Sequence, residues 1–548
     1  MTSLPLAIQQ RKRFIWAALF VAAFFLRLGL VHFLAGDLDG DSSGYLNLSR
    51  NLLRAHAYSI RPAAPFDPSF ARVPGYPLFI ALTWAASGID NLTAVRIAQA
   101  MIDTLTCVGV AALAGVWELD EKKKRTASLV AFALAALCPF TIRYVPTILA
   151  ETLSTFLAVS LALAASRALL AQTLRRALAW WAVAGILGGL GALVRPDGLL
   201  FFCAAVATLI AAAVWPGLGL GLGQAQKQGA GAGRVSRKEG SDKRQTSAWK
   251  SMPSLAHVLS CGATAVLAFT VTFAPWPIRN AVVFHQFIPL QPKHQGLPNG
   301  FVPSGYYDWL RTWVDDQRYI KPFRWEVDYS QIAVDQIPAR AFDSPEERAI
   351  VAQLLDRYNH PRANPAGTEI NGSAPQTAAK DERSVGAPRV RMTSEIDSGF
   401  ARIAEERRKR APLRFYFWLP ARRAVALWFD THSDHYPFGG ELFPLPDKSY
   451  FKDGSHSYLG YSGLWLFAAL VWLYTLLGLR GAWKLWRATQ PAARMFVVLV
   501  VLIMVSRLAL FSTLDNPEPR FLVQFFPFLA VLGGIALAHL QVLERRKP

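Results

Sequence analysis

The chain has 548 residues, of which 52% are hydrophobic and only 18% charged, and its formal net charge is +20. A soluble protein carries about 25% charged residues, whereas the apolar residues here gather into runs of about 20, the length that crosses a bilayer as a helix. This composition excludes a soluble enzyme, a fibrous protein and a disordered chain, and it lacks the short alternating strands of a transmembrane barrel. In a membrane protein an excess of Lys and Arg is typical of cytoplasmic loops, so we expect no nucleic-acid partner.

Ten apolar runs predict transmembrane helices, and an eleventh, Pro74–Ile89, is ambiguous because it has only about 16 residues. Most loop Lys and Arg residues fall in the segments 118–125, 167–176, 227–250 and 480–494. These share the cytoplasmic face only if Pro74–Ile89 does not cross, so we predict a juxtamembrane helix there, on the outer surface, with both termini in the cytoplasm. The predicted spans are Phe14–Leu34, Leu92–Trp117, Thr126–Tyr144, Thr147–Leu169, Leu178–Val194, Gly198–Trp215, Leu255–Trp276, Tyr458–Leu479, Met495–Thr513 and Phe521–Val542.

The predicted fold class is an all-α polytopic membrane protein with about ten transmembrane helices, a juxtamembrane helix and a large extracytoplasmic loop. Residues 1–280 form an N-terminal transmembrane module, with a first outer loop at 35–91 and a flexible, basic cytoplasmic linker at 217–253. Residues 281–457 form the extracytoplasmic loop region, and residues 458–548 form the C-terminal transmembrane helices.

Two acidic side chains are the main candidates for chemistry. Asp41 directly precedes an amphipathic helix predicted over Tyr45–Arg54, where it is either a plain N-cap or a reactive carboxylate near the membrane surface. Asp39 lies in the same acidic loop, which lacks the bidentate Glu of a calcium loop. Glu151 falls in the first turn of an outward-facing span, where the helix dipole alone favours an acid, although an acid at the rim of an apolar span also suggests function.

Four arginines are predicted on the outer face, where the positive-inside rule disfavours them. Arg72 precedes the juxtamembrane helix, and Arg195, Arg279 and Arg520 lie at three separate hairpins or span ends. A bound anion explains such a cluster, and a phosphate is the natural one. Arg72 taken alone could instead contact a lipid headgroup.

Charged residues and cysteines also occur inside the predicted spans. Arg96 and Asp103 are seven residues apart on one helix face, so we predict an ion pair between them. Arg27 and Arg507 lie within two other spans. The cysteines have no metal-ligand spacing and are expected to be buried packing thiols. They are Cys107, Cys138, Cys203 and Cys261.

These motifs, in this order, resemble the GT-C glycosyltransferases that use polyprenyl-phosphate sugars. The similarity is to the bacterial branch that contains the lipid A aminoarabinose transferases and lipopolysaccharide-core transferases, with the protein O-mannosyltransferases more distant. It runs through residues 14–280 and returns near the C-terminus. The matching motifs are Asp41-Ser42-Ser43-Gly44-Tyr45 followed by Ser49-Arg50-Asn51-Leu52-Leu53, Arg72-Val73-Pro74-Gly75-Tyr76, Glu151, Pro275-Trp276-Pro277-Ile278-Arg279-Asn280, and Pro519-Arg520-Phe521 before Pro527.

The resemblance implies a membrane glycosyltransferase of the hexosyl or pentosyl type, in which Asp41 takes the position of the catalytic aspartate. Many members carry a second acid where this chain has Ser42, and Asp where it has Glu151. The metal question therefore stays open, with no required cofactor as one expectation and a divalent cation as the other. The secondary site candidates are Asp39, Tyr45 and Asn280.

The first hypothesis is an inverting transferase that moves a sugar from a polyprenyl-phosphate donor to an extracytoplasmic glycan, lipid or protein acceptor. Asp41 is the expected general base, Glu151 is a second catalytic candidate, and arginines would stabilise the departing lipid phosphate. The aromatic segments Tyr306–Trp313 and Phe415–Trp428 are expected to close over sugar and acceptor. The phosphate partners are Arg72 and Arg279, then Arg195 and Arg520.

The alternative hypothesis is a transporter or flippase for an anionic lipid or glycolipid, which explains the spans and the arginines equally well. It predicts inverted repeats and broken helices, which the sequence does not display. A pure scaffold leaves the acids at Asp41 and Glu151 unexplained. The Ala-, Gly- and Arg-rich, Lys-poor composition indicates a bacterial cytoplasmic (inner) membrane, with the site on the extracytoplasmic face.

Overall fold

The computed structural model describes residues 6–34, 38, 40–215, 255–290, 301–360, 391–429, 458–490 and 492–544. The predicted linker 217–253 and the secondary candidate Asp39 lie outside these ranges. The described part of the chain is helical and contains no strand, which confirms the predicted all-α fold class.

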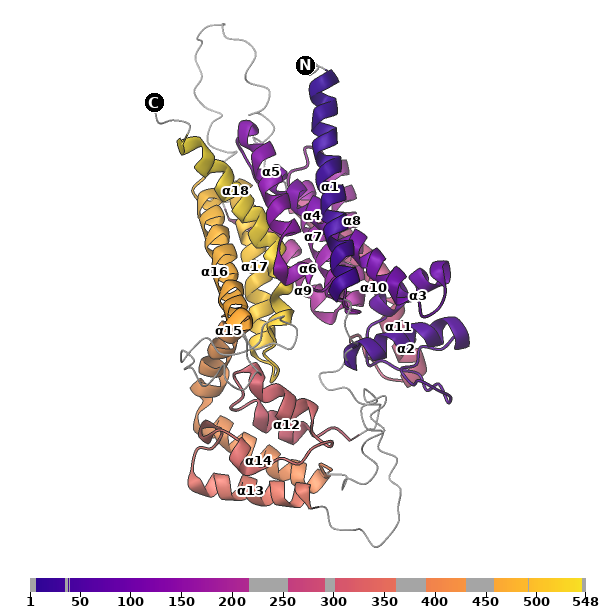
Figure 1. The fold of residues 1–548 in the computed structure, drawn as a ribbon, viewed down its shortest axis with the longest axis vertical. Coiled ribbons are helices and arrows are strands. Elements are labelled where there is room, and N and C mark those ends of the chain that lie inside the picture. Colours follow the sequence, from indigo (N-terminus) through magenta and orange to yellow (C-terminus); the bar gives the residue numbers. More distant parts are fainter. Residues whose placement is uncertain are drawn as a thin grey trace.

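Nine helices in the described part are long and apolar enough to cross a membrane. Most of them run along the long axis of the molecule, and the start of α1 and the end of α18 lie at the same end (Figure 1). The helices are α1 (Leu6–Leu34), α4 (Leu92–Trp117), α7 (Glu151–Leu169), α8 (Leu174–Val194), α9 (Leu199–Val214) after the short 3₁₀ turn η1 (Pro196–Gly198), α10 (Leu255–Phe273), α16 (Tyr458–Trp486), α17 (Ala492–Ser512) and α18 (Phe526–Glu544), which follows the 3₁₀ helix η9 (Pro519–Phe525).

The predicted span Thr126–Tyr144 is not one continuous helix. It begins earlier, as α5 (Glu121–Ala136), because the Asp120 side chain accepts a hydrogen bond from the backbone of Lys122 and caps the first turn. It ends before Pro139, which opens the separate short helix α6 (Pro139–Ile142), since proline cannot donate the backbone hydrogen bond that a helix interior needs. Helix α5 still packs between α4 and α18.

Two short helices, α2 (Gly40–Ala55) and α3 (Gly75–Ser87), lie at the end of the bundle that is remote from the start of α1 (Figure 1). Helix α3 has 13 residues, about 20 Å of helix, which is too short to cross, as predicted for Pro74–Ile89. Tyr76, Ile80 and Trp84 on α3 are buried with Leu46 of α2. Together α2 and α3 therefore form a platform against the ends of the spans.

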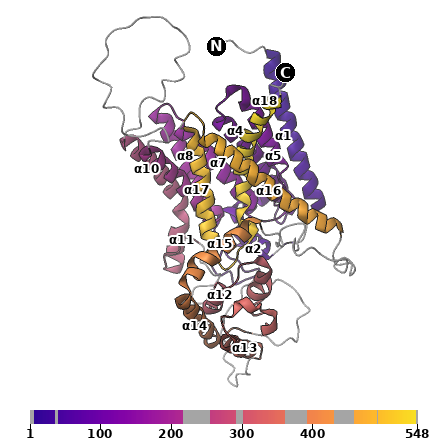
Figure 2. The ribbon, with the colours of Figure 1, turned by 90° about the vertical axis from the view of Figure 1, so that its left-hand side faces the viewer.

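A separate domain lies beyond the same end of the bundle in both ribbon views (Figures 1 and 2). We call it the α12–α14 domain; it consists of α12 (Ser304–Leu310), α13 (Pro345–Asn359), α14 (Ser394–Arg410) and the turns between them. Tyr306, Trp309 and Trp313 are at most 1% exposed and form its core. These rings of the segment Tyr306–Trp313 therefore hold the domain together and do not form the expected closing surface.

Buried charges inside the bundle are paired, but not as predicted. The carboxylate of Asp103 on α4 accepts a 2.7 Å hydrogen bond from Arg27 of α1, and both side chains are buried. Arg96 instead donates to the carbonyl oxygen of Pro146 at 2.8 Å. The predicted Arg96–Asp103 pair is therefore wrong. Other helices pack against the face of α4 that carries both residues, and α1 supplies Arg27 as the partner of Asp103. Among the cysteines, Cys203 is exposed on the outside of the bundle, contrary to prediction.

Close helix contacts in the bundle depend on small residues, as is common between membrane helices. At Gly481 of α16, an added Cβ would lie 2.1 Å from the backbone carbonyl oxygen of Leu532 in α18. That atom belongs to the backbone of a packed helix, so it cannot move aside as a flexible side chain would. At Gly262 of α10, by contrast, nothing lies within 4 Å of an added Cβ.

We expect Gly481→Ala to destabilise the protein by about 1–3 kcal/mol, because the α16–α18 contact would be overpacked. Gly262→Ala is the matched control and should be neutral or slightly stabilising, since alanine has the higher helix propensity. Thermal unfolding in detergent compares the two variants, and equal melting temperatures would contradict the predicted helix contact.

Candidate functional site

Asp41 lies in the first turn of α2, one residue inside the helix instead of before it. Its carboxylate is held by two arginines that are far away in the sequence. Oδ1 accepts a hydrogen bond from Arg72, 31 residues later, at 2.5 Å, and Oδ2 accepts one from Arg520, 479 residues later, at 3.0 Å. The fold therefore brings together three predicted site residues: Arg72 and Arg520 both contact the carboxylate of Asp41.

Arg72 is positioned by the aromatic residues around it. Its guanidinium carbon lies 5.5 Å from the ring centre of Tyr45, and its backbone carbonyl accepts a hydrogen bond from the Tyr58 hydroxyl at 2.9 Å. The Tyr45 ring packs edge-on against Tyr76 at 4.8 Å. Burial raises the pKa of Tyr45, so this tyrosine stays neutral. Burial lowers the pKa of Arg72, but the adjacent Asp41 carboxylate more than offsets this, and the net shift is upward.

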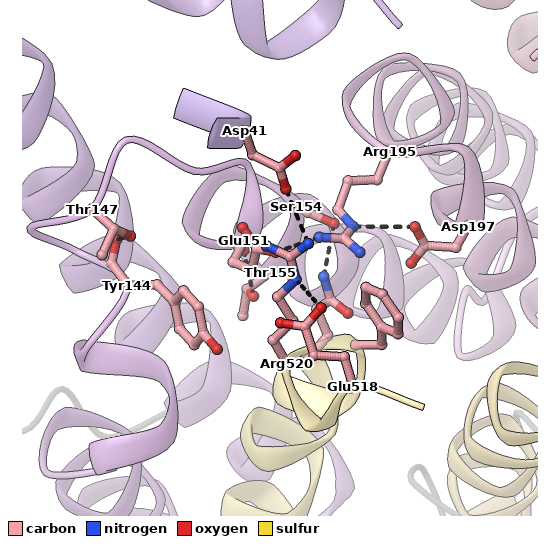
Figure 3. Close-up of polar contacts among 12 residues, drawn as sticks. Asp41, Tyr144, Thr147, Glu151, Ser154, Thr155, Arg195, Asp197, Glu518 and Arg520 are labelled. Carbon is pink, nitrogen blue, oxygen red and sulfur yellow. Dashed lines mark hydrogen bonds and ion pairs between the residues drawn. The ribbon is translucent and has the colours of Figure 1, made fainter. Parts of the chain in front are cut away.

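A second ion pair lies beside the first. Glu151, in the first turn of α7, accepts a hydrogen bond from Arg195 at 2.5 Å. Arg195 ends α8, and its Nε also contacts Asp197 of η1 at 3.1 Å. Figure 3 shows the side chains of Asp41, Glu151, Arg195 and Arg520 directed toward one another. We call these four residues, together with Arg72, the paired site.

Several residues that support the paired site were not predicted as site residues. Arg507 of α17 is fully buried and forms an ion pair with Asp197, and it donates to the backbone carbonyl of Phe521 at 2.6 Å. It also donates to Gln524, whose amide donates to Ser154 of α7 at 3.1 Å. The sequence marks Arg507 as a charge inside a span, whereas no sequence signal marks Gln524.

Arg520 also contacts a second acid, Glu518. Its Nε contacts Glu518 at 2.9 Å, and the Glu518 side chain is almost fully buried. The connection between α17 and η9, which precedes Arg520, contacts the α12–α14 domain. Arg311 donates to the carbonyl of Thr513 at 2.7 Å, and Arg324 forms an ion pair with Asp515. The domain therefore fixes the connection that leads into Arg520.

Arg279 and Asn280 lie apart from the paired site. Arg279, in α11 (Pro275–Phe284), donates to the carbonyl of Ser69 and to the Asn280 side chain, both at 2.9 Å. No carboxylate of the described residues forms an ion pair with it, and burial lowers its pKa. Tyr58 links it to Arg72, since the Arg279 guanidinium lies 5.4 Å from the Tyr58 ring centre. The side chain of Asn280 donates to the carbonyl of Ile288 at 2.8 Å.

The paired site is close to charge balance, because Arg72, Arg195 and Arg520 face acids on neighbouring elements. Within the described residues, no group of three or more His, Cys, Asp or Glu side chains is arranged to hold a metal ion. The arrangement places the carboxylate of Asp41 next to the guanidinium groups of Arg72 and Arg520, at the ends of membrane-spanning helices.

No family model and no curated protein matches the chain. Among solved structures, it is similar to the oligosaccharyltransferase AglB from Archaeoglobus fulgidus, in complex with an inhibitory peptide and a dolichol-phosphate, with a TM-score of 0.42 and 15% identity over 97% of this chain and 52% of that one. The chain thus spans about half the length of the AglB chain.

The chain is also similar to ArnT from Cupriavidus metallidurans. The TM-score is 0.37 with 13% identity for the apo structure, and 0.34 with 14% identity for the structure bound to undecaprenyl phosphate. Each comparison covers 96% of this chain and 78% of the other. With TM-scores below 0.5 these likenesses carry no argument about activity, which has to come from the site's own residues.

We expect Asp197→Asn to lower the stability of the protein by about 3–5 kcal/mol, because it leaves the buried guanidinium of Arg507 without a compensating charge. Asp90→Asn is the matched control, since Asp90 also contacts two arginines, Arg50 and Arg54. The Asp90 side chain is 42% exposed and that of Asp197 only 9%, so the control should lose at most about 1 kcal/mol. Equal losses in thermal unfolding would show that the Asp197–Arg507 pair is not a buried support.

Proposed function

We propose that the protein is an inverting glycosyltransferase that moves a sugar from a polyprenyl phosphate to an acceptor hydroxyl, with Asp41 as the general base. The observation that carries the proposal is the contact of Asp41 with both Arg72 and Arg520. It combines a proton acceptor with two anion-binding groups where membrane helices end, which is where a membrane-borne phosphate would meet them.

The proposed reaction needs one base and one stabilised leaving group. The Asp41 carboxylate accepts the proton of the acceptor hydroxyl while its oxygen forms a bond to the anomeric carbon. The bond from that carbon to the phosphate oxygen breaks, its electron pair stays on the polyprenyl phosphate, and the configuration is inverted. The two guanidinium groups lie beside the Asp41 carboxylate, and its 28% side-chain exposure leaves room for a hydroxyl to approach. General-base catalysis of this kind contributes about 10²–10⁴ in rate.

Arg279 supports the assignment of the donor as a phosphate. A half-buried guanidinium that no described carboxylate compensates is well suited to an anionic ligand, and burial lowers the pKa of Arg279. The Tyr58 ring contacts the Arg279 guanidinium, and the Tyr58 hydroxyl donates to the backbone carbonyl of Arg72. We therefore assign the donor phosphate to the guanidinium groups of these two arginines, with the anomeric carbon of the donor sugar directed toward Asp41.

Glu151 is proposed as a positioning residue and not as a second base. Its side chain is only 3% exposed and it is bound to Arg195, so it cannot readily reach a substrate. Arg195 is directed toward Arg520 in Figure 3. Glu151 would therefore keep Arg195 in place as a secondary stabiliser of negative charge that develops on the leaving phosphate.

The proposed setting is a bacterial cytoplasmic (inner) membrane. The partners are a polyprenyl-phosphate-linked sugar, a glycan, lipid or protein acceptor, and membrane lipids. The reaction as written requires no cofactor. The basic connection between α4 and α5 lies at one end of the bundle, and α2, which carries Asp41, lies at the other end (Figure 1). By the positive-inside rule we propose that the site faces the extracytoplasmic side.

We expect Asp41→Asn to reduce sugar transfer by about 10²–10⁴, because it keeps the shape of the side chain but removes the proton acceptor. Transfer from a radiolabelled donor by purified protein is the measurement. Asp67→Asn is the control, since Asp67 lies in the connection between α2 and α3 that carries Arg72 and forms an ion pair with Arg61. Wild-type turnover of the Asn variant would rule out Asp41 as the base and would favour a lipid transporter.

We expect Arg279→Ala to raise the donor concentration needed for half-maximal transfer by about ten- to a hundredfold, the equivalent of the 1.5–3 kcal/mol of one charge-assisted contact. Arg279→Lys should give an intermediate loss, because lysine keeps the charge but not the planar guanidinium. Arg61→Ala removes a surface arginine from the same region and should change nothing. An unchanged donor dependence in Arg279→Ala would place the phosphate elsewhere.

A further inference from the structure

A basic and aromatic turn joins the α12–α14 domain to the bundle. Arg408, Lys409 and Arg410 end α14, and the π-helical turn Arg414–Trp418 leads into α15 (Leu419–Phe429). We call residues 408–422 the basic-aromatic turn. Phe415 and Leu419 of this turn are buried, but four of its other large apolar side chains are at least 60% exposed. The exposed side chains are Leu413, Tyr416, Phe417 and Trp418.

The contacts at the two ends of α15 show how deep in the bilayer these side chains lie. At its C-terminal end, Trp428 donates to Thr475 at 3.0 Å and Phe429 stacks on Trp472 at 4.5 Å. Both partners lie near the middle of α16, a predicted span. Helix α15 has 11 residues, about 16 Å, which is about half of the 30 Å hydrocarbon thickness.

At its other end, the turn contacts the α12–α14 domain, where Arg414 donates to Asp343 at 2.8 Å. Figure 1 shows α15 beside the ends of α16 and α17 that face this domain. The exposed aromatic side chains therefore lie between the membrane-spanning bundle and the domain outside it, which is the level of the bilayer interface.

Cations exceed carboxylates on this turn. Asp343 is contacted by Arg407, Arg410 and Arg414 together. Glu405 is similarly shared by Arg408 and Lys409, and the side chains of Lys409 and Arg410 remain 76% and 56% exposed. The surplus positive charge stands next to the exposed rings, so the surface combines apolar area with an attraction for anions.

We propose that the basic-aromatic turn is a bilayer-surface anchor that inserts Tyr416, Phe417 and Trp418 among anionic phospholipid headgroups. Trp and Tyr favour the membrane–water interface because one side of the ring is apolar and the other polar. Surface Lys and Arg are attracted to anionic lipids. This inference is independent of the proposed reaction. It gives the turn the role of holding the α12–α14 domain, and with it the connection to Arg520, at a constant height above the membrane.

The test places an environment-sensitive fluorophore on Phe417→Cys in full-length protein in lipid nanodiscs, with the four native cysteines replaced by serine. The matched control is Ile350→Cys, at another exposed position. Ile350 belongs to α13, the helix at the side of the α12–α14 domain away from the bundle (Figure 1). We expect a blue-shifted emission and strong quenching by spin-labelled lipid at position 417. At position 350 we expect quenching by aqueous iodide only.

The lipid dependence is tested with the same labelled protein in discs with and without anionic phospholipid. We expect stronger lipid quenching at position 417 in the anionic discs, and we expect Lys409→Gln with Arg410→Gln to remove that difference. Tyr416→Cys provides the same test if Phe417→Cys does not fold. Iodide quenching at 417 equal to that at 350 would overturn the proposal, and so would protection from both quenchers, which would mean that protein covers the turn. Equal lipid quenching in both kinds of disc would overturn the recognition of anionic lipid.

Discussion

The contact of one carboxylate with two distant guanidinium groups is the constraint on which the candidate site depends. Asp41 comes from the first helix after α1, Arg72 from the connection before α3, and Arg520 from the turn before the last helix. The three side chains meet only if the N-terminal and C-terminal helices of the bundle pack together. Since a charge that loses its partner away from water is costly, each member of the cluster also enforces the packing of the element that carries it.

The surrounding structure explains how such a concentration of charge is tolerated. Arg507 and Asp197 supply a further buried ion pair beside Arg195, and Glu518 forms an ion pair with Arg520. Arg311 and Arg324 of the α12–α14 domain bind the connection that leads to Arg520. The buried part of the site is thus made by ion pairs within the bundle, while the side chain of Asp41 stays partly open to solvent.

Hydropathy and loop charge predicted most of the bundle, because both report on transfer into lipid and need no knowledge of neighbours. They did not predict the break in the span Thr126–Tyr144, where α5 ends before Pro139. Charge pairing was harder to predict, since spacing along one helix says nothing about other helices. Asp103 therefore pairs with Arg27 and not with Arg96. Motif order indicated Asp41, Arg72 and Arg520, whereas the separate location of Arg279 and the bridging role of Gln524 depend on tertiary packing that no local pattern encodes.

The most direct measurement of the central claim is sugar transfer by the purified protein in detergent, with a panel of radiolabelled polyprenyl-phosphate sugars as donors and mixed glycan, lipid and protein acceptors. The account predicts that at least one donor loses its sugar to an acceptor with release of the free polyprenyl phosphate and inversion at the anomeric carbon. If the protein binds these donors but transfers from none of them, and instead moves the lipid across reconstituted vesicles, the site is that of a transporter and the glycosyltransferase account is contradicted.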